Sequence, residues 1–264
     1  MEGLNGKTVA LIDADSLIFI IGSNHRDSDD EDSVIEACKS LLDMIMTTSM
    51  STHYIGSFSG ANCFREDVYK VRKYKGTRGP KEDWYYKWKP LITKTYKEEY
   101  KFMEHEGLEA DDVIIAANHF VRMAGGDTVI CSNDKDLRQV PGRFFDYKKI
   151  EFADVDFDQA RRNLLVQYLA GDSTDNIAGV PKVGPVKAKT ILDKEDGEEL
   201  GEDLAVLSTF KDYYGPYYGE IIYKETVQVV QMVQPGHPQW SKYEPTMRTA
   251  ITGALVNTQD YDFE

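Results

Sequence analysis

Eight acidic side chains occupy four short stretches of the sequence. They are Asp13 in LIDADSL, Glu109, Asp111 and Asp112 in GLEADDV, Asp134 and Asp136 in SNDKDL, and Asp172 and Asp175 in GDSTDN. Carboxylates that are brought together repel one another, and partial burial strengthens the repulsion, so cations must neutralise them. Because no histidine or cysteine accompanies the set, its oxygen ligands favour Mg²⁺ or Mn²⁺ over zinc. Two such ions would stabilise the attacking and leaving oxygens of an in-line displacement at phosphorus.

Each of these acids also has a structural interpretation. An aspartate after a strand is commonly a turn residue or a helix cap, and acids at positions 109–112 would stabilise a helix N-terminus without any metal. Taken singly, each residue is more often structural than catalytic. Convergence of the four clusters is what favours a metal site, and convergence depends on the fold.

The elements that must position these acids alternate between strands and helices. Short apolar runs predict buried strands at residues 7–12, 54–58 and 128–131, and Asp13 and Asp134 follow the first and third of them. Helical spacing predicts helices from about Ser33, from about Glu109 and over residues 158–169. The alternation predicts an α/β fold with a mostly parallel sheet and helices on both faces. Functional groups collect beyond the carboxyl ends of the strands in such sheets.

A second motif, GVPKVGPVKAK, follows the last acidic cluster and predicts a phosphate-binding turn. Gly179 and Gly184 permit close approach of the backbone, and Pro185 suits the first position of a helix. Amides at the start of that helix can bind a phosphate oxygen, and Lys182 and Lys187 would add positive charge. Ordinary helix hairpins also use glycine and proline, so this motif alone does not decide the function.

The formal charge of −14 opposes binding to a polyanion, but the charge is unevenly distributed. Residues 65–101 hold 12 Lys or Arg and 6 Asp or Glu, a net charge of +6, which leaves 19 cations and 39 acids, a net charge of −20, elsewhere. Aromatic side chains are interleaved with these cations: Tyr69, Tyr74, Trp84, Tyr85, Tyr86, Trp88 and Tyr96. They suit either stacking on unpaired bases or a buried helix face from which lysines extend to solvent. The charge asymmetry favours a functional role for Lys75 and Arg78.

Composition excludes several other classes of protein. The longest apolar run, residues 17–21, is too short to span a bilayer, and the chain does not open with a signal-peptide pattern. Three cysteines without a CxxC pair indicate reduced thiols. We therefore expect a monomeric cytoplasmic protein that is not associated with membranes, located in the host cytoplasm if a phage encodes it.

With these motifs in order, the chain resembles the 5′-to-3′ exonuclease and flap endonuclease family, found in phages and in the 5′ nuclease domain of bacterial DNA polymerase I. The similar motifs run in family order from Leu11 to Leu192: LIDADSL, YKGTR, GLEADDV, SNDKDL and GDSTDNIAGVPKVGPVKAKTIL. The last motif is the most specific. The resemblance implies a PIN-like catalytic region at residues 1–157, with an arch at about 76–100. It also implies a helical DNA-binding region at 158–264, with a helix-three-turn-helix at about 164–193.

The resemblance further implies roles for individual residues. One metal ion would be held by Asp13, Glu109, Asp111 and Asp134, and a second by Asp134, Asp136, Asp172 and Asp175, with Asp112 just outside the ligand set. Lys75 and Arg78 would contact the scissile phosphate. The turn would bind DNA through Gly179, Val180, Lys182, Gly184 and Lys187, and family members bind potassium there through backbone carbonyls. The expected partner is DNA with a 5′ end or flap, or an RNA–DNA hybrid.

The sequence departs from the family at the end of the second strand. The family has a metal-binding aspartate there, whereas HYIGSFSGANCFR offers Ser57, Phe58, Ser59 and Gly60. The first metal site would therefore bind its ion more weakly, use water or a neutral oxygen, or take an acid from elsewhere. The segment between Lys75 and Glu109 is also short for an arch that fully encloses a strand.

Two other functions would use part of the same pattern. DAD after a strand, Ser132 after another strand and GDSTD resemble the motif order of haloacid-dehalogenase-type phosphatases, in which the first aspartate is a nucleophile. That interpretation requires GD directly after a strand, but NLLVQYLAGD has helical spacing. A non-catalytic module that binds branched DNA would explain the missing strand-end aspartate, but binding alone does not require so many acids. We predict a divalent-metal-dependent 5′ nuclease of DNA replication, repair or recombination.

Overall fold

A seven-stranded sheet forms the centre of the protein, whose computed structural model describes residues 3–195 and 197–260. Six strands lie in the order β3-β2-β1-β4-β5-β6, and β9 also pairs with β2. Four of the pairings are parallel, whereas β5–β6 and β2–β9 are antiparallel. The strands are β1 (Thr8–Asp13), β2 (His53–Ser59), β3 (Met103–His105), β4 (Asp127–Cys131), β5 (Gly142–Asp146), β6 (Glu151–Val155) and β9 (Val256–Asn257). The mostly parallel sheet predicted from the sequence is confirmed.

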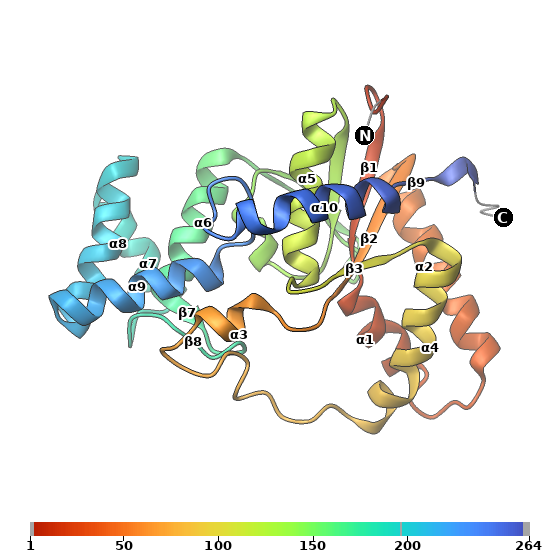
Figure 1. The fold of residues 1–264 in the computed structure, drawn as a ribbon, viewed down its shortest axis with the longest axis horizontal. Helices are drawn as coiled ribbons and strands as arrows, with labels where there is room; N and C mark the ends of the chain where they lie inside the picture. The colour runs from red at the N-terminus through yellow and green to blue at the C-terminus, as the bar shows by residue number, and fades with distance from the viewer. Residues whose placement is uncertain (1–2, 196, 261–264) are drawn as a thin grey trace.

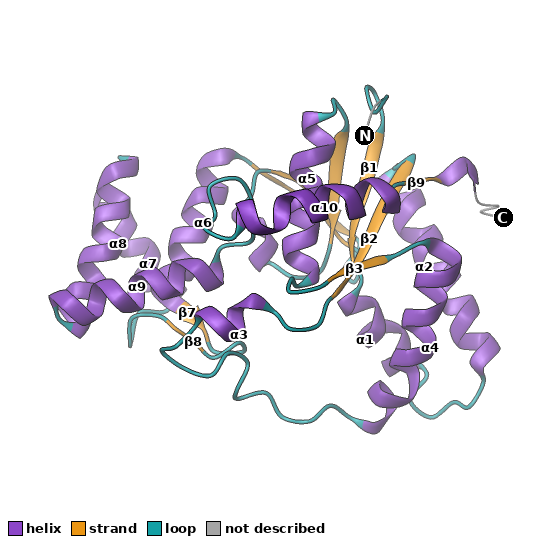
Figure 2. Cartoon of the chain, in the orientation of Figure 1, coloured by secondary structure: helices purple, strands orange, loops and turns teal. Residues whose placement is uncertain are grey.

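Helices cover both faces of this sheet (Figures 1 and 2). Along β1, Val9 and Leu11 point into one core and Ala10 and Ile12 into the other. Successive residues of a strand face opposite ways, so a strand buried on both faces must be apolar throughout. One face is covered by α5 (Ala110–Met123) and α10 (Trp240–Ala254), and the other by α1 (Asp15–Asn24), α2 (Glu31–Ser49) and α4 (Asp83–Tyr100).

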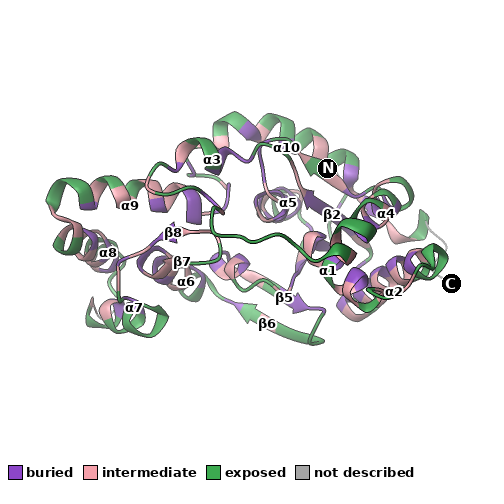
Figure 3. Cartoon of the chain, turned by 90° about the horizontal axis from the view of Figure 1, so that it is seen from below, coloured by how far each residue is buried: buried purple, intermediate pink, exposed green. Residues whose placement is uncertain are grey.

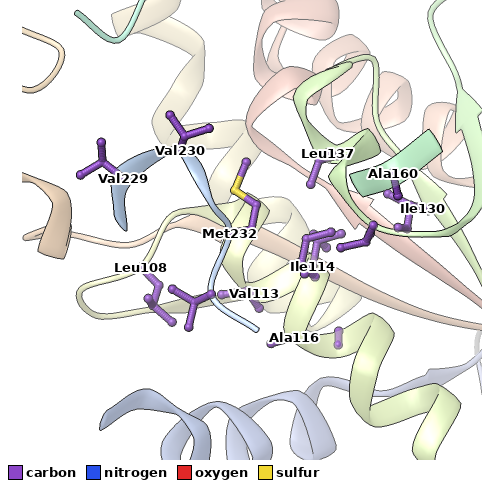
Figure 4. Close-up of a cluster of buried hydrophobic side chains, with 14 of the residues drawn as sticks. Leu108, Val113, Ile114, Ala116, Ile130, Leu137, Ala160, Val229, Val230 and Met232 are labelled. Carbon is purple, nitrogen blue, oxygen red and sulfur yellow. The ribbon is translucent and has the colours of Figure 1, made fainter. Parts of the chain in front are cut away.

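The remaining helices extend from the α5 side of the sheet. They are α3 (Phe64–Val68), α6 (Phe157–Ala170), α7 (Pro185–Leu192), α8 (Glu199–Tyr214) and α9 (Pro216–Val230). A hairpin of two short strands, β7 (Gly171–Asp172) and β8 (Ile177–Ala178), lies between α6 and α7 in the chain. The described chain also contains the short turns η1 (Asp136–Gln139), η2 (Asp193–Glu195) and η3 (Thr258–Asp260). Val230 is the last residue of α9, and Met232 follows that helix. Figure 4 shows both side chains near Val113 and Ile114 of α5. All four side chains belong to one buried cluster, so the helical part and the sheet share a core.

The last elements differ from the expected division of the chain at residue 158. Helix α10 packs on α5, with the rings of Trp240 and Phe120 5.5 Å apart, and β9 pairs Val256 with Tyr54 of β2. Their apolar faces are buried against the sheet, which a purely local sequence pattern does not specify. Residues 240–257 therefore belong structurally with the first region.

The expected arch segment is partly built into the core. Trp88, Ile92 and Tyr96 of α4 are buried in the core that α4 forms with α1 and α2 on one face of the sheet. Of the eight aromatic residues at positions 65–101, Tyr86 alone is exposed, at 58%. The buried aromatic face is thus the correct interpretation for Trp88 and Tyr96. Residues 69–82, which connect α3 to α4, form a largely exposed crossing loop (Figure 3).

Two observations bear on what was expected from the composition. Cys38, Cys63 and Cys131 are buried and form no disulfide, and burial raises the pKa of the Cys63 thiol to about 11. A thiol that stays protonated is a poor nucleophile, so these cysteines are structural. Within residues 3–195 and 197–260, no helix is both long and apolar enough to cross a membrane.

Candidate active site

The carboxyl ends of β1, β2 and β4 face a cavity of about 780 Å³. The cavity lies between the sheet edge and the β7–β8 hairpin, and residues from many separate segments of the chain line it. Seven of the eight acids singled out in the sequence are among these residues: Asp13, Glu109, Asp111, Asp134, Asp136, Asp172 and Asp175. The fold therefore brings the four acidic clusters to one place.

Burial and crowding raise the pKa of several of these carboxyls. Burial, followed by the charge of Asp15, raises the pKa of Asp13 to about 7. Burial, followed by the charge of Asp134, raises the pKa of Asp136 to about 6. Burial also raises the pKa of Asp111, to which the charge of Asp13 contributes. Each shift means that the ionised carboxylates lack sufficient positive charge around them.

Cationic side chains from the crossing loop reach into this acidic cavity. The Lys75 ammonium pairs with Glu109 and lies 3.8 Å from Oδ2 of Asp175, and the Arg78 guanidinium pairs with Asp175. The Tyr74 hydroxyl lies 2.7 Å from Oε2 of Glu109 and 3.0 Å from Oδ2 of Asp175. Lys75 and Arg78 line the cavity, as their expected role requires, and their ion pairs attach the crossing loop to both walls.

Asp112, which was predicted to lie just outside the ligand set, does not line the cavity and is held by contacts within the protein. It is fully buried, and its two carboxylate oxygens accept hydrogen bonds from Arg65 at 2.5 and 2.8 Å. The backbone N–H groups of Glu109 and Val233 also donate to it, at 3.2 and 2.9 Å. Burial acts to raise the pKa of Asp112, but the charge and hydrogen bonds of Arg65 outweigh burial and lower it. These contacts make Asp112 a structural anchor for the start of α5.

Several residues that line the cavity were not given a site role from the sequence. Asp15 is the first residue of α1, and its Oδ1 accepts a hydrogen bond from the Ser59 amide at 3.2 Å. Tyr74 is the first residue of the YKGTR motif, in which only Lys75 and Arg78 were given roles, whereas nothing in the sequence distinguishes Arg65 from its neighbours. Asp15 carried a usable signal, because it lies two positions after Asp13 in the same motif.

The predicted DNA-binding turn lies beside the cavity. Gly184 caps the N-terminus of α7 and lines the cavity, and Lys182 and Lys187 are exposed. Gly179 is required by packing, because a Cβ there would lie 2.3 Å from the carbonyl carbon of Ala170. These positions leave the two lysines and the helix start free to meet a ligand.

Val180 differs from its predicted role as a DNA-contacting residue. Its side chain is buried in the core, at 4% exposure. Its N–H donates to the Leu169 carbonyl at 2.8 Å, and its carbonyl accepts from Val183 at 3.0 Å. With both backbone groups bonded inside the protein, Val180 shapes the turn and is a core residue.

The donor set fits hard divalent cations. Eight carboxylates, with Asp15 included, and three cationic side chains line the cavity, a formal excess of five negative charges. No histidine or cysteine of the described chain lines it, and the Asn133 Oδ1 is a buried oxygen without a hydrogen-bond partner in the structure. Oxygen donors with excess negative charge suit Mg²⁺ or Mn²⁺.

The cavity carboxylates of the described chain are not grouped as the ligands of a single metal ion. No three Asp, Glu, His or Cys side chains within the described ranges are grouped closely enough to hold one metal ion. Glu109 and Asp175 instead pair with Lys75 and Arg78. Metal binding at these two acids would therefore require their side chains to leave those cations.

Residues 8–161 match the family described as 5′-3′ exonuclease, N-terminal resolvase-like domain. The chain belongs to the 5′-3′ exonuclease family. This member is 31% identical over 144 residues to DNA polymerase I of Rhizobium leguminosarum, covering 51% of this chain and 14% of the polymerase. It is 29% identical over 170 residues to flap endonuclease Xni of Shewanella amazonensis, covering 61% of this chain and 65% of that protein. The matches thus span less than two thirds of either relative.

Solved structures share the fold of this 5′-3′ exonuclease family member. The T5 D15 protein, co-crystallised with metal ions, matches with a TM-score of 0.70 at 14% identity, covering 94% of this chain and 98% of that chain. The bacteriophage T5 D15 flap endonuclease, in a pseudo-enzyme–product complex with DNA and metal ions, matches with a TM-score of 0.66 at 15% identity, covering 93% and 100%. The predicted fold class is confirmed by these neighbours.

Proposed function

We propose that this protein is a divalent-metal-dependent 5′ nuclease that hydrolyses phosphodiester bonds near the 5′ end of duplex or flapped DNA. The observation that carries the proposal is the meeting of seven acids from four separate clusters in one cavity, in a member of the 5′-3′ exonuclease family. Related T5 structures are described as containing metal ions, and one contains DNA. Replication, repair or recombination is the proposed setting.

Two ions, Mg²⁺ or Mn²⁺, would be shared among the cavity acids. The first set is Asp13, Glu109, Asp111 and Asp134, and the second is Asp134, Asp136, Asp172 and Asp175. Bound there, the ions would activate water and stabilise charge on the attacking and leaving oxygens. Lys75 and Arg78 would leave their carboxylate partners and neutralise the phosphate that is cleaved.

The duplex would be held by the turn between α6 and α7. Its exposed lysines, Lys182 and Lys187, would contact backbone phosphates, and the start of α7 at Gly184 would present free amides. Potassium at backbone carbonyls of this turn, an RNA–DNA hybrid as substrate, a monomeric state and a cytoplasmic location remain predictions. The positions of the two lysines beside the cavity support a duplex that runs from the turn to the acids.

The phosphatase alternative loses its main support. Gly171 and Asp172 form a two-residue strand directly after helix α6, whereas that reaction would need them after a buried strand. A non-catalytic module that only binds branched DNA would not explain why the pKa values of Asp13 and Asp136 are raised. The nuclease accounts for both.

The test is cleavage of 5′-labelled blunt, recessed and flapped duplexes in Mg²⁺ by the double variant Asp172→Asn/Asp175→Asn. We expect it to abolish cleavage and to spare DNA binding measured without cleavage in Ca²⁺. Asp193→Asn is the matched control, because this carboxylate pairs with Arg162 and does not line the cavity. Wild-type turnover in the double variant would refute the assignment. The length of the wild-type products separates exonuclease from flap endonuclease action.

A further inference from the structure

The C-terminal end of β2 reaches the cavity without a carboxylate of its own. Ser57 pairs in register with Asp13 of β1, and Ser59 lines the cavity. The Ser59 hydroxyl accepts a hydrogen bond from the Ala110 amide at 3.0 Å, beside the acids that begin α5. The strand end is therefore close to the acidic wall but contributes only neutral oxygens.

Asp15 places a carboxylate over this strand end. Its Oδ1 accepts the Ser59 N–H at 3.2 Å, and its own N–H donates to Oδ1 of Asp13, also at 3.2 Å. The two contacts hold Asp15 between the ends of β1 and β2, and its side chain lines the cavity. The position is fixed by backbone groups, so it does not depend on a flexible partner.

The second oxygen of Asp15 is uncommitted. In the described part of the chain, Asp15 forms no ion pair, and its Oδ2 accepts no hydrogen bond. Among the seven other cavity acids, Glu109 and Asp175 have cationic partners, whereas the remaining five form no ion pair within the described residues. A half-buried carboxylate beside Asp13 without a cation is unfavourable unless a cation comes from solvent.

A purely structural role would be that of a first-turn acid, which favours the dipole of α1. Asp32 plays that part in α2 at an exposed position and does not line the cavity. Asp15 instead faces seven other carboxylates in the cavity. The helix dipole does not require this crowded orientation.

We infer that Asp15 is a ligand of the divalent ion held by Asp13 and supplies the carboxylate that β2 lacks. The inference rests on the proposed function, since it assigns a further ligand to the same site. The ligand is a hard divalent cation, Mg²⁺ or Mn²⁺, bound through carboxylate oxygen.

The test is Mn²⁺ binding by isothermal titration calorimetry, without DNA, for wild type, Asp15→Asn and the control Asp32→Asn. Asparagine can still accept the Ser59 hydrogen bond, so the variant removes charge and keeps shape. We expect Asp15→Asn to weaken Mn²⁺ binding by about tenfold or more, the range for losing a residue that supports a metal site. Asp32→Asn should match wild type. Thermal midpoints in EDTA should be equal or higher in Asp15→Asn, because a like charge beside Asp13 is removed.

Wild-type Mn²⁺ affinity and stoichiometry in Asp15→Asn would overturn the inference and leave the proposed nuclease intact. A wild type that binds no Mn²⁺ would overturn both. Adding Ser59→Asp to Asp15→Asn should recover much of the affinity by returning a carboxylate to the strand end. Wild-type crystals grown with Mn²⁺ give a second test that does not depend on any variant folding. They should place an ion directly bound to an Asp15 oxygen, and an ion bound to Asp13 but remote from Asp15 would contradict the inference.

Discussion

Replacing Asp112 by asparagine should destabilise the protein by about 3 to 5 kcal/mol, the usual effect of removing one partner of a buried ion pair. Arg65 is 2% exposed and Asp112 is 0% exposed, and two hydrogen bonds join them. The nearest remaining anion is Glu109, whose Oε2 lies 3.7 Å from Nη1 of Arg65. Glu109 already binds Lys75 and Tyr74, so it can compensate Arg65 only weakly. The asparagine amide would also turn a donor toward the guanidinium.

The assay is urea denaturation at neutral pH in EDTA, which removes any contribution from metal binding to the folded state. Glu98→Gln is the matched control, because Glu98 and Lys94 form an exposed pair at 3.9 Å, with 67% exposure each, and should lose less than about 0.5 kcal/mol. The pKa of Asp112 is lowered in the folded protein, so its stabilisation is present above the unfolded value of 3.8 and is lost as pH falls below it. The difference between wild type and variant should shrink in that acidic range.

A double variant sharpens this prediction. Arg65→Met/Asp112→Leu removes both charges, so it should lose less stability than the sum of the two single variants. It still leaves the N–H groups of Glu109 and Val233 without their acceptor, at about 1 to 3 kcal/mol each. A loss below about 1 kcal/mol in Asp112→Asn would refute the argument that the pair is both buried and mutually compensated.

In EDTA, the free energy of unfolding of the wild type should fall as pH rises from 3.8 to about 7, because folded Asp13 keeps a proton that the unfolded chain has released. Urea denaturation across that pH range should show a flatter dependence on pH for Asp13→Asn. Lys182→Ala should weaken DNA binding equally for all sequences and lower the slope of log K against log salt by about 1, by fluorescence anisotropy, and a sequence-selective loss would count against it. Trp88→Ala should lower the free energy of unfolding by about 3 to 5 kcal/mol, whereas Tyr86→Ala should change it by less than about 0.5. Equal effects of the last two variants would contradict the orientation of α4.

The strands were predictable because their signal is local. The apolar runs at 7–12 and 128–131 correspond to Thr8–Asp13 and Asp127–Cys131, and both are buried in a sheet covered on two faces. Such burial demands an uninterrupted apolar stretch that ends where polar side chains begin. The same rule placed Asp13 and Asp134 at one edge of the sheet, where the cavity lies.

Asp112 was not predictable in the same way. Asp111 and Asp112 are identical in type and adjacent in sequence, but neighbouring residues on a helix point about 100° apart. One therefore faces the cavity and the other faces Arg65, 47 positions away in the chain. The return of α10 and β9 to the sheet depends on contacts that are even more distant in the chain, which no local pattern encodes.

In the proposed nuclease, the pairing of Lys75 and Arg78 with cavity acids would couple metal binding to DNA binding. While these cations hold Glu109 and Asp175, they cannot neutralise a phosphate. A divalent ion bound by Glu109 and Asp175 would free both cations, so the ion and the phosphate would each strengthen the binding of the other. Such coupling is reciprocal by thermodynamic necessity. The excess negative charge of the cavity would then link metal binding to substrate binding, because the three cations that line it cannot satisfy eight carboxylates and a phosphate together.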